Sequence, residues 1–444
     1  MAIKTAPAKS PAAAYPRIAV APPGPKARLV IEKDKAFAST SYIKEYPLVI
    51  AGGRGAMVED VDGNRYIDWM AGIAVSSTGY NHPAVVKAVQ DAAGKFLHIC
   101  GTDFYYEAFA DLCERLAKSA PWKGPSRVFL TNSGTEAVEG AVKLARRHTR
   151  RGALIAFQSA FHGRSYAAMS LSASKVKYRA GFGPLLPEVY HLPFHNPYRN
   201  TLEDCVAAAR DLFESRLAPQ DVAAVILEPM QGEGGYVLPS KEFLQFWRKT
   251  CDEHGIVLIY DEIQCGVGRT GKMWAADVYG VEPDVLLSAK GLGSGMPIGA
   301  ILAKESVMTW TRGSHGSTYG GNPVACAAAL ATLDLVTNGL SANAAKMGAR
   351  LLAGLKKLQA KHASIGDVRG LGLFIGVEFV KDRATKEPDG ELMGKLEQLA
   401  FTKGLLLLGC GKSVIRIAPP LVLSEYDVDK GLEIFGACLS EIEA

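Results

Sequence analysis

One lysine stands alone in an otherwise uncharged stretch, LLSAKGLGSGMPIGAIL, which runs from Leu286 to Leu302. Apolar runs lie on both sides of Lys290, and small residues surround it. Burial of a lysine lowers its pKa and makes a neutral amine available as a nucleophile. The alternative is a structural lysine at a strand end, with its charged end reaching solvent. The chemistry of Lys290 therefore depends on what the fold places around it.

Two adjacent carboxylates, Asp261 and Glu262, follow another apolar run in YDEIQCGVGRTG. Side chains alternate along a strand, so only one of the two can face a given side. We expect Asp261 to share a crevice with Lys290, because parallel α/β sheets bind ligands at the carboxyl ends of their strands. The competing interpretation of Asp261 is a carboxylate that caps a helix or serves a structural pair.

Two further motifs follow strand-like runs and suit a flat, phosphorylated ligand. In TNSGTEAVEGAVKLAR, the residues Ser133, Gly134 and Thr135 open a helix whose N–H groups and hydroxyls can bind phosphate, although an ordinary helix cap has the same composition. In AFHGRSY, Phe161 can stack on a planar ring and Arg164 can bind a carboxylate. A core phenylalanine beside a surface arginine is the plain alternative.

Lysine, aspartate, aromatic ring and phosphate-binding turn are together the groups that pyridoxal phosphate requires. Lys290 would form a Schiff base with its aldehyde, and Asp261 would keep the ring nitrogen protonated so that the ring accepts electrons. Lys290 would then move the substrate proton as general base and acid. A dinucleotide site does not fit, because GLGSG precedes the strand-like MPIGAILA and lacks the downstream acid.

Predicted strands and helices alternate from about residue 127, and these elements must position the groups described above. Six apolar runs cover 127–131, 153–157, 222–227, 256–260, 284–289 and 298–303, and a weaker seventh covers 188–192. Helical stretches between most of them predict a mostly parallel sheet covered on both faces. We therefore predict an α/β fold whose parts are an N-terminal arm at 1–30, a segment at 31–80 that contributes to the small domain, a large domain at 81–330 with a seven-stranded sheet, and a small α+β domain at 331–444.

Composition limits the classes of function. The 444 residues are 48% hydrophobic and 21% charged, with a net charge of +5, which is typical of a globular enzyme and provides no basic patch for nucleic acid. No apolar run approaches the roughly 20 residues of a membrane span, and the N-terminus lacks the apolar core of a secretory signal. The eight cysteines are scattered without zinc-binding spacing, which predicts reduced thiols in a cytoplasmic protein and no metal site.

The motifs NSGTEAVEGAVKLAR, FHGRS, EPMQGEGG, DEIQCGVGRTG, SAKGLGSGMPIGA and STYGGNP together resemble those of the class III pyridoxal-phosphate aminotransferases, over nearly the whole chain. The resemblance implies a fold-type I enzyme that forms a homodimer, or a dimer of dimers, with the active site at the subunit interface. It implies that Lys290 is the Schiff-base lysine, that Asp261 binds the pyridine nitrogen and that Gln264 reaches the phenolic oxygen. The other implied cofactor contacts are Ser133, Gly134 and Thr135 at the phosphate, Ile263 and Phe161 on the two ring faces, His162 beside Phe161, and Thr318 at the phosphate of the other subunit.

The resemblance also implies a substrate site that accepts two unlike molecules in turn. Arg164 would bind one carboxylate, and Arg416 would bind the α-carboxylate of glutamate or 2-oxoglutarate. Glu233 would pair with Arg416 when an ω-amine donor is bound and so mask its charge, whereas a permanent structural salt bridge is the alternative. Ile73 occupies a pocket position where ornithine-specific members often carry tyrosine, and 4-aminobutyrate and acetylornithine members carry isoleucine.

Two reactions are consistent with these expectations. One transfers the terminal amine of an ω-amino acid, such as 4-aminobutyrate, ornithine or N-acetylornithine, to 2-oxoglutarate and gives glutamate. The other racemises or epimerises an α-amino acid, because PPGPKAR and LLGCG resemble a subgroup that includes racemases. Both reactions use Lys290 and Asp261 alike. A scaffolding or cofactor-storing protein is disfavoured, because every expected site residue is present.

Overall fold

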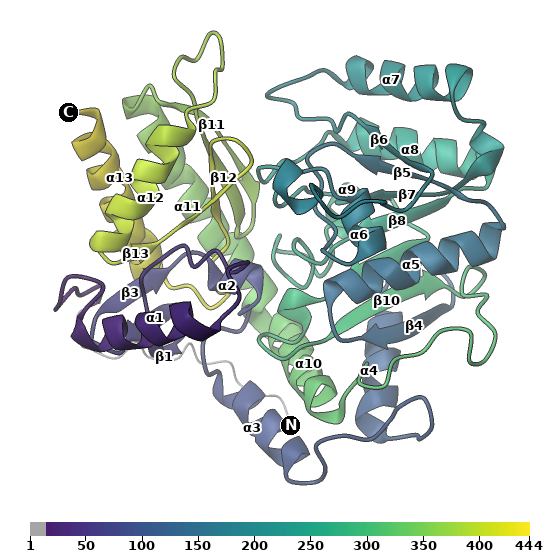
Figure 1. The fold of residues 1–444 in the computed structure, drawn as a ribbon, viewed down its shortest axis with the longest axis horizontal. Helices are drawn as coiled ribbons and strands as arrows, with labels where there is room; N and C mark the ends of the chain where they lie inside the picture. The colour runs from purple at the N-terminus through teal and green to yellow at the C-terminus, as the bar shows by residue number, and fades with distance from the viewer. Residues whose placement is uncertain (1–14) are drawn as a thin grey trace.

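A computed structural model describes residues 15–444 (Figure 1). The first 14 residues of the predicted arm lie outside this range. Helix α1 (Pro25–Phe37) begins within the last residues of the predicted arm. The carboxylate of Asp62 accepts two hydrogen bonds of 3.0 Å from N–H groups in the first turn of this helix. Asp62, which is distant in the chain, thus binds N–H groups that have no partner within the helix. The sequence around the helix does not reveal this contact.

The large sheet contains seven strands, in the order β4 (Ser126–Thr131), β10 (Gly299–Lys304), β9 (Val285–Ser288), β8 (Val257–Asp261), β7 (Val222–Leu227), β5 (Ala153–Phe157) and β6 (Val189–Leu192). Only β10 runs antiparallel to its neighbours among these strands, so the sheet is mostly parallel, as predicted. Every residue of β5, β7, β8 and β9 is buried. Such burial is required of strands that are covered on both faces.

Helices cover both faces of this sheet (Figure 1). One face packs against α5 (Gly134–Thr149) and α6 (Tyr166–Leu171). The opposite face packs against α4 (Glu107–Lys118), α7 (Leu202–Ser215), α8 (Lys241–His254) and α10 (Pro323–Leu335). Alternate residues of each strand enter one core or the other, which explains why the strand sequences are continuously apolar.

Strands from the N-terminal and C-terminal parts of the described chain meet in the second region of the molecule. Strands β1 (Ile50–Arg54), β2 (Met57–Asp60) and β3 (Arg65–Asp68) form a sheet with β13 (Leu405–Leu406), which pairs in parallel with β3. Strands β2 and β3 form a hairpin, and Gly63 in its turn has a φ of +87°. A further sheet has the order β11 (Ile365–Leu371), β12 (Phe374–Phe379), β15 (Val414–Ile417) and β14 (Leu408–Cys410), beside helices α11 (Ser341–Lys361), α12 (Gly390–Thr402) and α13 (Glu425–Glu443).

A long apolar helix connects the two regions. Helices α10 and α11 are joined by a π-helical turn at Val336–Leu340, in which Gly339 has a φ of +155°. By length and composition alone, Pro323–Lys361 would suffice to cross a membrane, with a mean hydropathy of 1.4 in its most apolar window. However, 56% of that window is buried inside the protein. Because α10 packs against α4 and α3 (Pro83–Ala93), this segment has the surroundings of a core helix.

Candidate active site

A cavity of about 380 Å³ lies at the carboxyl ends of the central strands of the large sheet. Nine of the ten predicted cofactor residues line it, namely Ser133, Gly134, Thr135, Phe161, His162, Asp261, Ile263, Gln264 and Lys290. The tenth, Thr318, is exposed and does not line the cavity of its own chain. Parallel α/β sheets bind their ligands at this edge, so the fold brings the predicted residues to the expected place.

Lys290 follows β9 closely and has a φ of +40°. Its amine makes no hydrogen bond or ion pair with any residue of the described range. Burial lowers the pKa of Lys290, while the carboxylates of Asp261 and Glu228 oppose that shift. A buried amine with a lowered pKa and no ion pair is suited to nucleophilic chemistry.

Asp261 ends β8 and is almost fully buried. One carboxylate oxygen lies 2.7 Å from Nδ1 of His162, and the other accepts a hydrogen bond of 3.0 Å from the N–H of Ile263. Burial alone would lower the pKa of His162, but the hydrogen bond and charge of Asp261 raise it. The neighbouring Glu262 instead accepts hydrogen bonds from two N–H groups at the start of α9 (Ala276–Tyr279). The helix-capping role considered for Asp261 therefore belongs to Glu262.

Two buried polar atoms on residues that line the cavity have no partner in the described part of the chain. They are Nε2 of His162 and Oε1 of Gln264. Buried polar groups in folded proteins are hydrogen-bonded with few exceptions, so unpaired ones beside a cavity indicate that a polar ligand belongs there. With the unpaired amine of Lys290 and the carboxylate of Asp261, they fit the polar ring of pyridoxal phosphate.

The start of α5 forms one end of the cavity. Oγ of Ser133 accepts a hydrogen bond of 3.4 Å from the N–H of Glu136, so Ser133 is the ordinary N-cap considered for it. A side chain at Gly134 would approach Ile263 to 2.8 Å, so glycine allows the helix to lie this close. Because a helix N-terminus presents N–H groups and a partial positive charge, this end also suits a phosphate.

Glu228 also lines the cavity and was not predicted from the sequence. It follows β7 directly and accepts hydrogen bonds from the N–H groups of Phe161 (3.0 Å) and Gly232 (2.8 Å). Burial raises the pKa of Glu228 to about 7, with the charge of His162 acting against this rise. Glu228 therefore ties the Phe161 loop to the segment that carries Glu233. Its place directly after a strand, in EPMQGEGG, was the signal available in the sequence.

Glu233 and Arg416 form a buried ion pair near the cavity. Oε2 of Glu233 lies 2.9 Å from Nη1 of Arg416, and both side chains are 9% exposed. The other oxygen of Glu233 has two partners that were not predicted, Nζ of Lys175 at 2.9 Å and the hydroxyl of Tyr178 at 3.3 Å. Burial alone would raise the pKa of Glu233, but Arg416 and Lys175 lower it. Lys175 and Tyr178 follow α6, where no sequence pattern indicates which side chains turn inward.

Three predicted site residues remain outside this cluster in the single chain. Arg164 is exposed and stacks on Tyr178, with its guanidinium carbon 4.7 Å from the ring centre. Ile73, in α2 (Ala71–Ala74), has a φ of +67° and is 43% exposed. Like Thr318, neither residue lines the cavity of its own chain.

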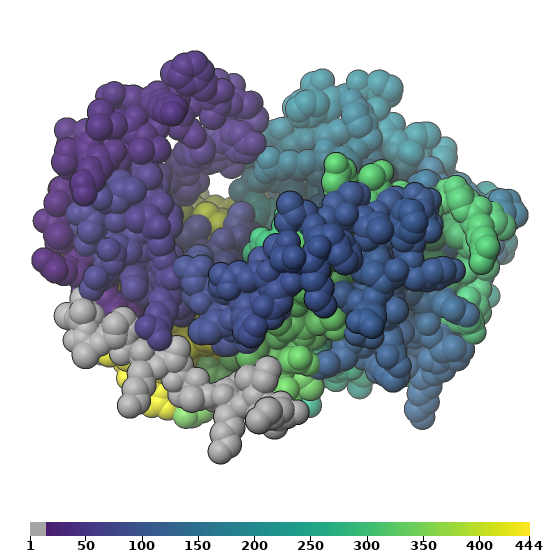
Figure 2. Space-filling view, turned by 90° about the horizontal axis from the view of Figure 1, so that it is seen from below, coloured from purple at the N-terminus to yellow at the C-terminus, as the bar shows by residue number. Residues whose placement is uncertain are grey.

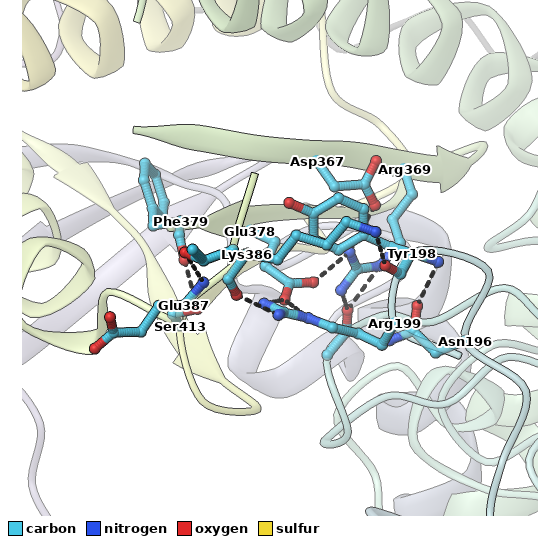
Figure 3. Close-up of polar contacts among 12 residues, drawn as sticks. Asn196, Tyr198, Arg199, Asp367, Arg369, Glu378, Phe379, Lys386, Glu387 and Ser413 are labelled. Carbon is cyan, nitrogen blue, oxygen red and sulfur yellow. Dashed lines mark hydrogen bonds and ion pairs between the residues drawn. The ribbon is translucent and has the colours of Figure 1, made fainter. Parts of the chain in front are cut away.

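Arg369 is the centre of a polar network with Asp367 and Glu378, which Figure 3 draws, and it also binds the chain just after Glu233. From Nε, Arg369 donates hydrogen bonds of 3.2 and 3.1 Å to two carbonyl oxygens that follow Glu233 in the chain. Its Nη1 contacts carboxylate oxygens of Asp367 and Glu378, at 2.7 and 2.6 Å. These residues lie on β11 and β12, and β12 pairs with β15, the strand of Arg416. The two partners of the ion pair are thus held by one connected framework.

Residues 39–439 match the family model described as Aminotransferase class-III. The chain therefore belongs to the class III aminotransferases, which are enzymes of amino-acid metabolism that depend on pyridoxal phosphate. The family and the cofactor predicted from the sequence are confirmed.

Three similar proteins have names that describe different reactions. The 5-aminovalerate aminotransferase DavT of Pseudomonas aeruginosa is 41% identical over 89% of this chain and 94% of its own length. The 4-aminobutyrate aminotransferase of Mycobacterium tuberculosis is 39% identical over 95% of this chain and 97% of its own length. The alanine/serine racemase of Pyrococcus horikoshii is 38% identical over 96% of this chain and 93% of its own length.

Solved structures agree with the architecture. A Bacillus anthracis aminotransferase superposes with a TM-score of 0.87 and 29% identity, over 94% of this chain and 99% of its own. An amine transaminase from an uncultivated Pseudomonas species, described as PLP-bound, gives a TM-score of 0.85 and 31% identity, over 91% and 97% of the two chains. The predicted fold class is confirmed.

Proposed function

We propose that this enzyme transfers the terminal amine of an ω-amino acid, such as 4-aminobutyrate or 5-aminovalerate, to 2-oxoglutarate and so produces glutamate. The observation that carries the proposal is the buried Glu233–Arg416 pair, because an arginine masked by a movable carboxylate can serve donors with and without an α-carboxylate. The names of the relatives from Pseudomonas aeruginosa and Mycobacterium tuberculosis support the same class of donor.

The cavity residues have distinct roles in this proposal. Pyridoxal phosphate, when bound, supplies an aldehyde and an electron-accepting ring. Lys290 would hold the cofactor through its amine. Once the substrate amine had displaced it, its free Nζ would take the proton from the amine-bearing carbon of the substrate and deliver it to the cofactor instead of returning it to that carbon. Asp261, which His162 contacts at 2.7 Å, would keep the ring nitrogen protonated. The remaining proposed contacts are Gln264 at the phenolic oxygen, Ile263 and Phe161 on the two ring faces, and Ser133, Gly134 and Thr135 at the phosphate.

The substrate residues would act in two states. With an ω-amino acid bound, Arg164 holds its single carboxylate and Glu233 stays on Arg416. With glutamate or 2-oxoglutarate bound, Glu233 leaves, and Arg416 receives the α-carboxylate while Arg164 keeps the other one. Two arginines fit a five-carbon dicarboxylate, because each can bind a carboxylate through two N–H groups. Ile73 would line the pocket for the carbon chain.

The exposed apolar surface supports a homodimer. Between α3 and α4, the side chains of Phe96, Leu97, Phe104 and Tyr105 are 41, 69, 57 and 100% exposed. They adjoin a groove of about 940 Å³ between α3, α4 and α10, and Figure 2 shows the α3–α4 segment across the middle of this face. Contiguous exposed apolar side chains mark protein interfaces. A second copy on this face would let Thr318 reach the phosphate of the other subunit, and sedimentation of Tyr105→Asp as a monomer would test this.

We also propose a cytoplasmic location. All eight cysteines of the chain are free thiols. Free thiols without disulfides are typical of a reducing compartment. Fractionation of cells that express the full chain would test the location, and recovery outside the cytoplasmic fraction would contradict it.

Racemisation is the second candidate, because a racemase is 38% identical over most of this chain. Incubation of the holoenzyme in deuterated water with ω-amino acids, α-amino acids and 2-oxoglutarate separates the two by proton NMR. Glutamate formed from an ω-amine donor supports amino transfer and names the donor. Deuterium at the α-carbon, with accumulation of the opposite enantiomer and little glutamate, contradicts it and establishes racemisation.

A further inference from the structure

Glu233 lies among more positive charge than it can neutralise. Its two carboxylate oxygens contact Arg416 and Lys175, each at 2.9 Å. The hydroxyl of Tyr178 lies 3.3 Å from the oxygen that contacts Lys175, and Arg164 stacks on the ring of Tyr178. Within residues 15–444, no other carboxylate pairs with any of these three cations. Two positive charges therefore remain for the carboxylates of a ligand.

Release of Arg416 by Glu233 poses an electrostatic problem. A carboxylate that is 9% exposed cannot leave its cation at low cost, because an unpaired buried charge is strongly destabilising. Lys175 removes this problem, since it already holds the oxygen of Glu233 that does not face Arg416. Lys175 is 33% exposed and belongs to the segment after α6, whereas Arg416 belongs to β15. Glu233 can thus break its ion pair with Arg416 and still keep its ion pair with Lys175.

We propose that Lys175, assisted by Tyr178, is the positioning residue that holds Glu233 in the open state and so allows Arg416 to bind a second carboxylate. This inference rests on the proposed function, because only a site that alternates between one and two carboxylates needs such a release. A ligand with one carboxylate leaves Glu233 on Arg416, so its binding does not need Lys175 to hold Glu233 in the open state. A ligand with two carboxylates depends on it.

Binding of two unreactive acids to the holoenzyme tests the inference by calorimetry. Glutarate has five carbons and two carboxylates, whereas valerate has five carbons and one. We expect Lys175→Met to weaken glutarate binding about tenfold and to change valerate binding less than about twofold. Lys272→Met is the control, because it removes the same charge from an exposed side chain that has no ion pair in the described chain and does not touch Tyr178. It should change neither affinity, and thermal unfolding would verify that each variant is folded.

A double-mutant cycle with Glu233→Gln separates Lys175 acting through Glu233 from Lys175 acting on the ligand. In the Glu233→Gln background, Lys175→Met should no longer change glutarate binding, because there is no carboxylate left to hold. Unchanged glutarate binding in Lys175→Met alone would overturn the inference. A loss that persists in the Glu233→Gln background would overturn it too, because Lys175 would then contact the ligand itself.

Failure of the proposed function has a different signature. A wild-type holoenzyme that makes no glutamate from any ω-amine donor contradicts the function, while the difference between glutarate and valerate still reports on Lys175. A wild-type enzyme that binds neither acid overturns both.

Discussion

The active site has a cofactor end and a substrate end that differ in origin and in charge. The cofactor end lies at the edge of one sheet and consists of Lys290, Asp261, His162 and Gln264. The substrate end joins three separate parts of the chain and consists of Glu233, Arg416, Lys175 and Tyr178. At the cofactor end, an amine, an imidazole nitrogen and an amide oxygen have no partner in the described chain. At the substrate end, the carboxylate of Glu233 is already bound by two cations.

This difference shows how one site can hold one molecule permanently and exchange others. Unpaired buried polar atoms are costly, so they favour continuous occupancy by a single matching ligand. Internally paired charges impose competition, because each arriving carboxylate must displace an internal one. Substitutions at the cofactor end should therefore abolish chemistry, whereas those at the substrate end should change the choice of substrate.

The largest effect is expected for Lys290→Ala. Loss of both the nucleophile and the base should lower the rate of glutamate formation at least about 10,000-fold, with little change in the thermal stability of the cofactor-free protein, where the amine has no partner among the described residues. Steady-state assays and thermal unfolding would measure both. Lys272→Ala, at an exposed position, is the control and should keep the wild-type rate. A Lys290→Ala enzyme within about tenfold of wild type would refute the proposed mechanism.

Two neighbouring carboxylates provide a second test of the cofactor end. Asp261→Asn should slow turnover about 1,000-fold, because the ring nitrogen loses its charged partner. Glu262→Gln should leave the rate per folded molecule nearly unchanged and instead lower the free energy of unfolding by about 1–2 kcal/mol, because Glu262 binds the start of α9. Kinetics and urea unfolding of both variants would show the contrast. The reverse pattern would mean that Glu262 faces the cofactor.

Glu228 connects the two ends and should make stability depend on pH. Burial raises the pKa of Glu228 from 4.5 to about 7 in the folded protein. Its contribution to stability is therefore fully present below pH 4.5 and is lost as the pH rises through about 7. Between about pH 5 and about pH 8 the loss should be about 2 kcal/mol.

Glu228→Gln cannot ionise, so it should lack this loss. Urea unfolding of cofactor-free wild type and variant at both pH values measures it, because the difference between them cancels the titration of other groups. Parallel pH profiles of the two proteins would contradict the assignment to Glu228.

The smallest effect is expected at the substrate end, for Glu233→Gln. An uncharged side chain no longer masks Arg416, so the preference for ω-amino donors over α-amino acids should fall about tenfold while chemistry continues. The ratio of kcat/KM for 4-aminobutyrate to that for glutamate measures the change. A large fall in kcat with both donors would contradict the difference proposed between the two ends.

Part of the cofactor end could be predicted from local sequence pattern, whereas Gln264 and His162 were assigned from the resemblance to the family. Lys290 and Asp261 come after continuous apolar runs, and strand ends in a parallel sheet converge on one edge. The alternation of side chains along a strand shows that only one of Asp261 and Glu262 can face the crevice, and the resemblance to the family selects Asp261. Glu228 also directly follows a strand, but it was not predicted as a site residue, because a carboxylate after a strand has several ordinary roles.

The sequence by itself determined the succession of strands and helices along the chain, the mostly parallel sheet and the residues gathered at its edge. These features follow from local periodicity and chain direction. Tertiary structure alone decided that Lys175 and Tyr178 also contact Glu233 and that Asp62 caps α1. These contacts join residues far apart in the chain, through segments without periodic pattern. The physical reason is that a long-range ion pair depends on how loops close over the sheets, and no local preference of the backbone encodes that closure.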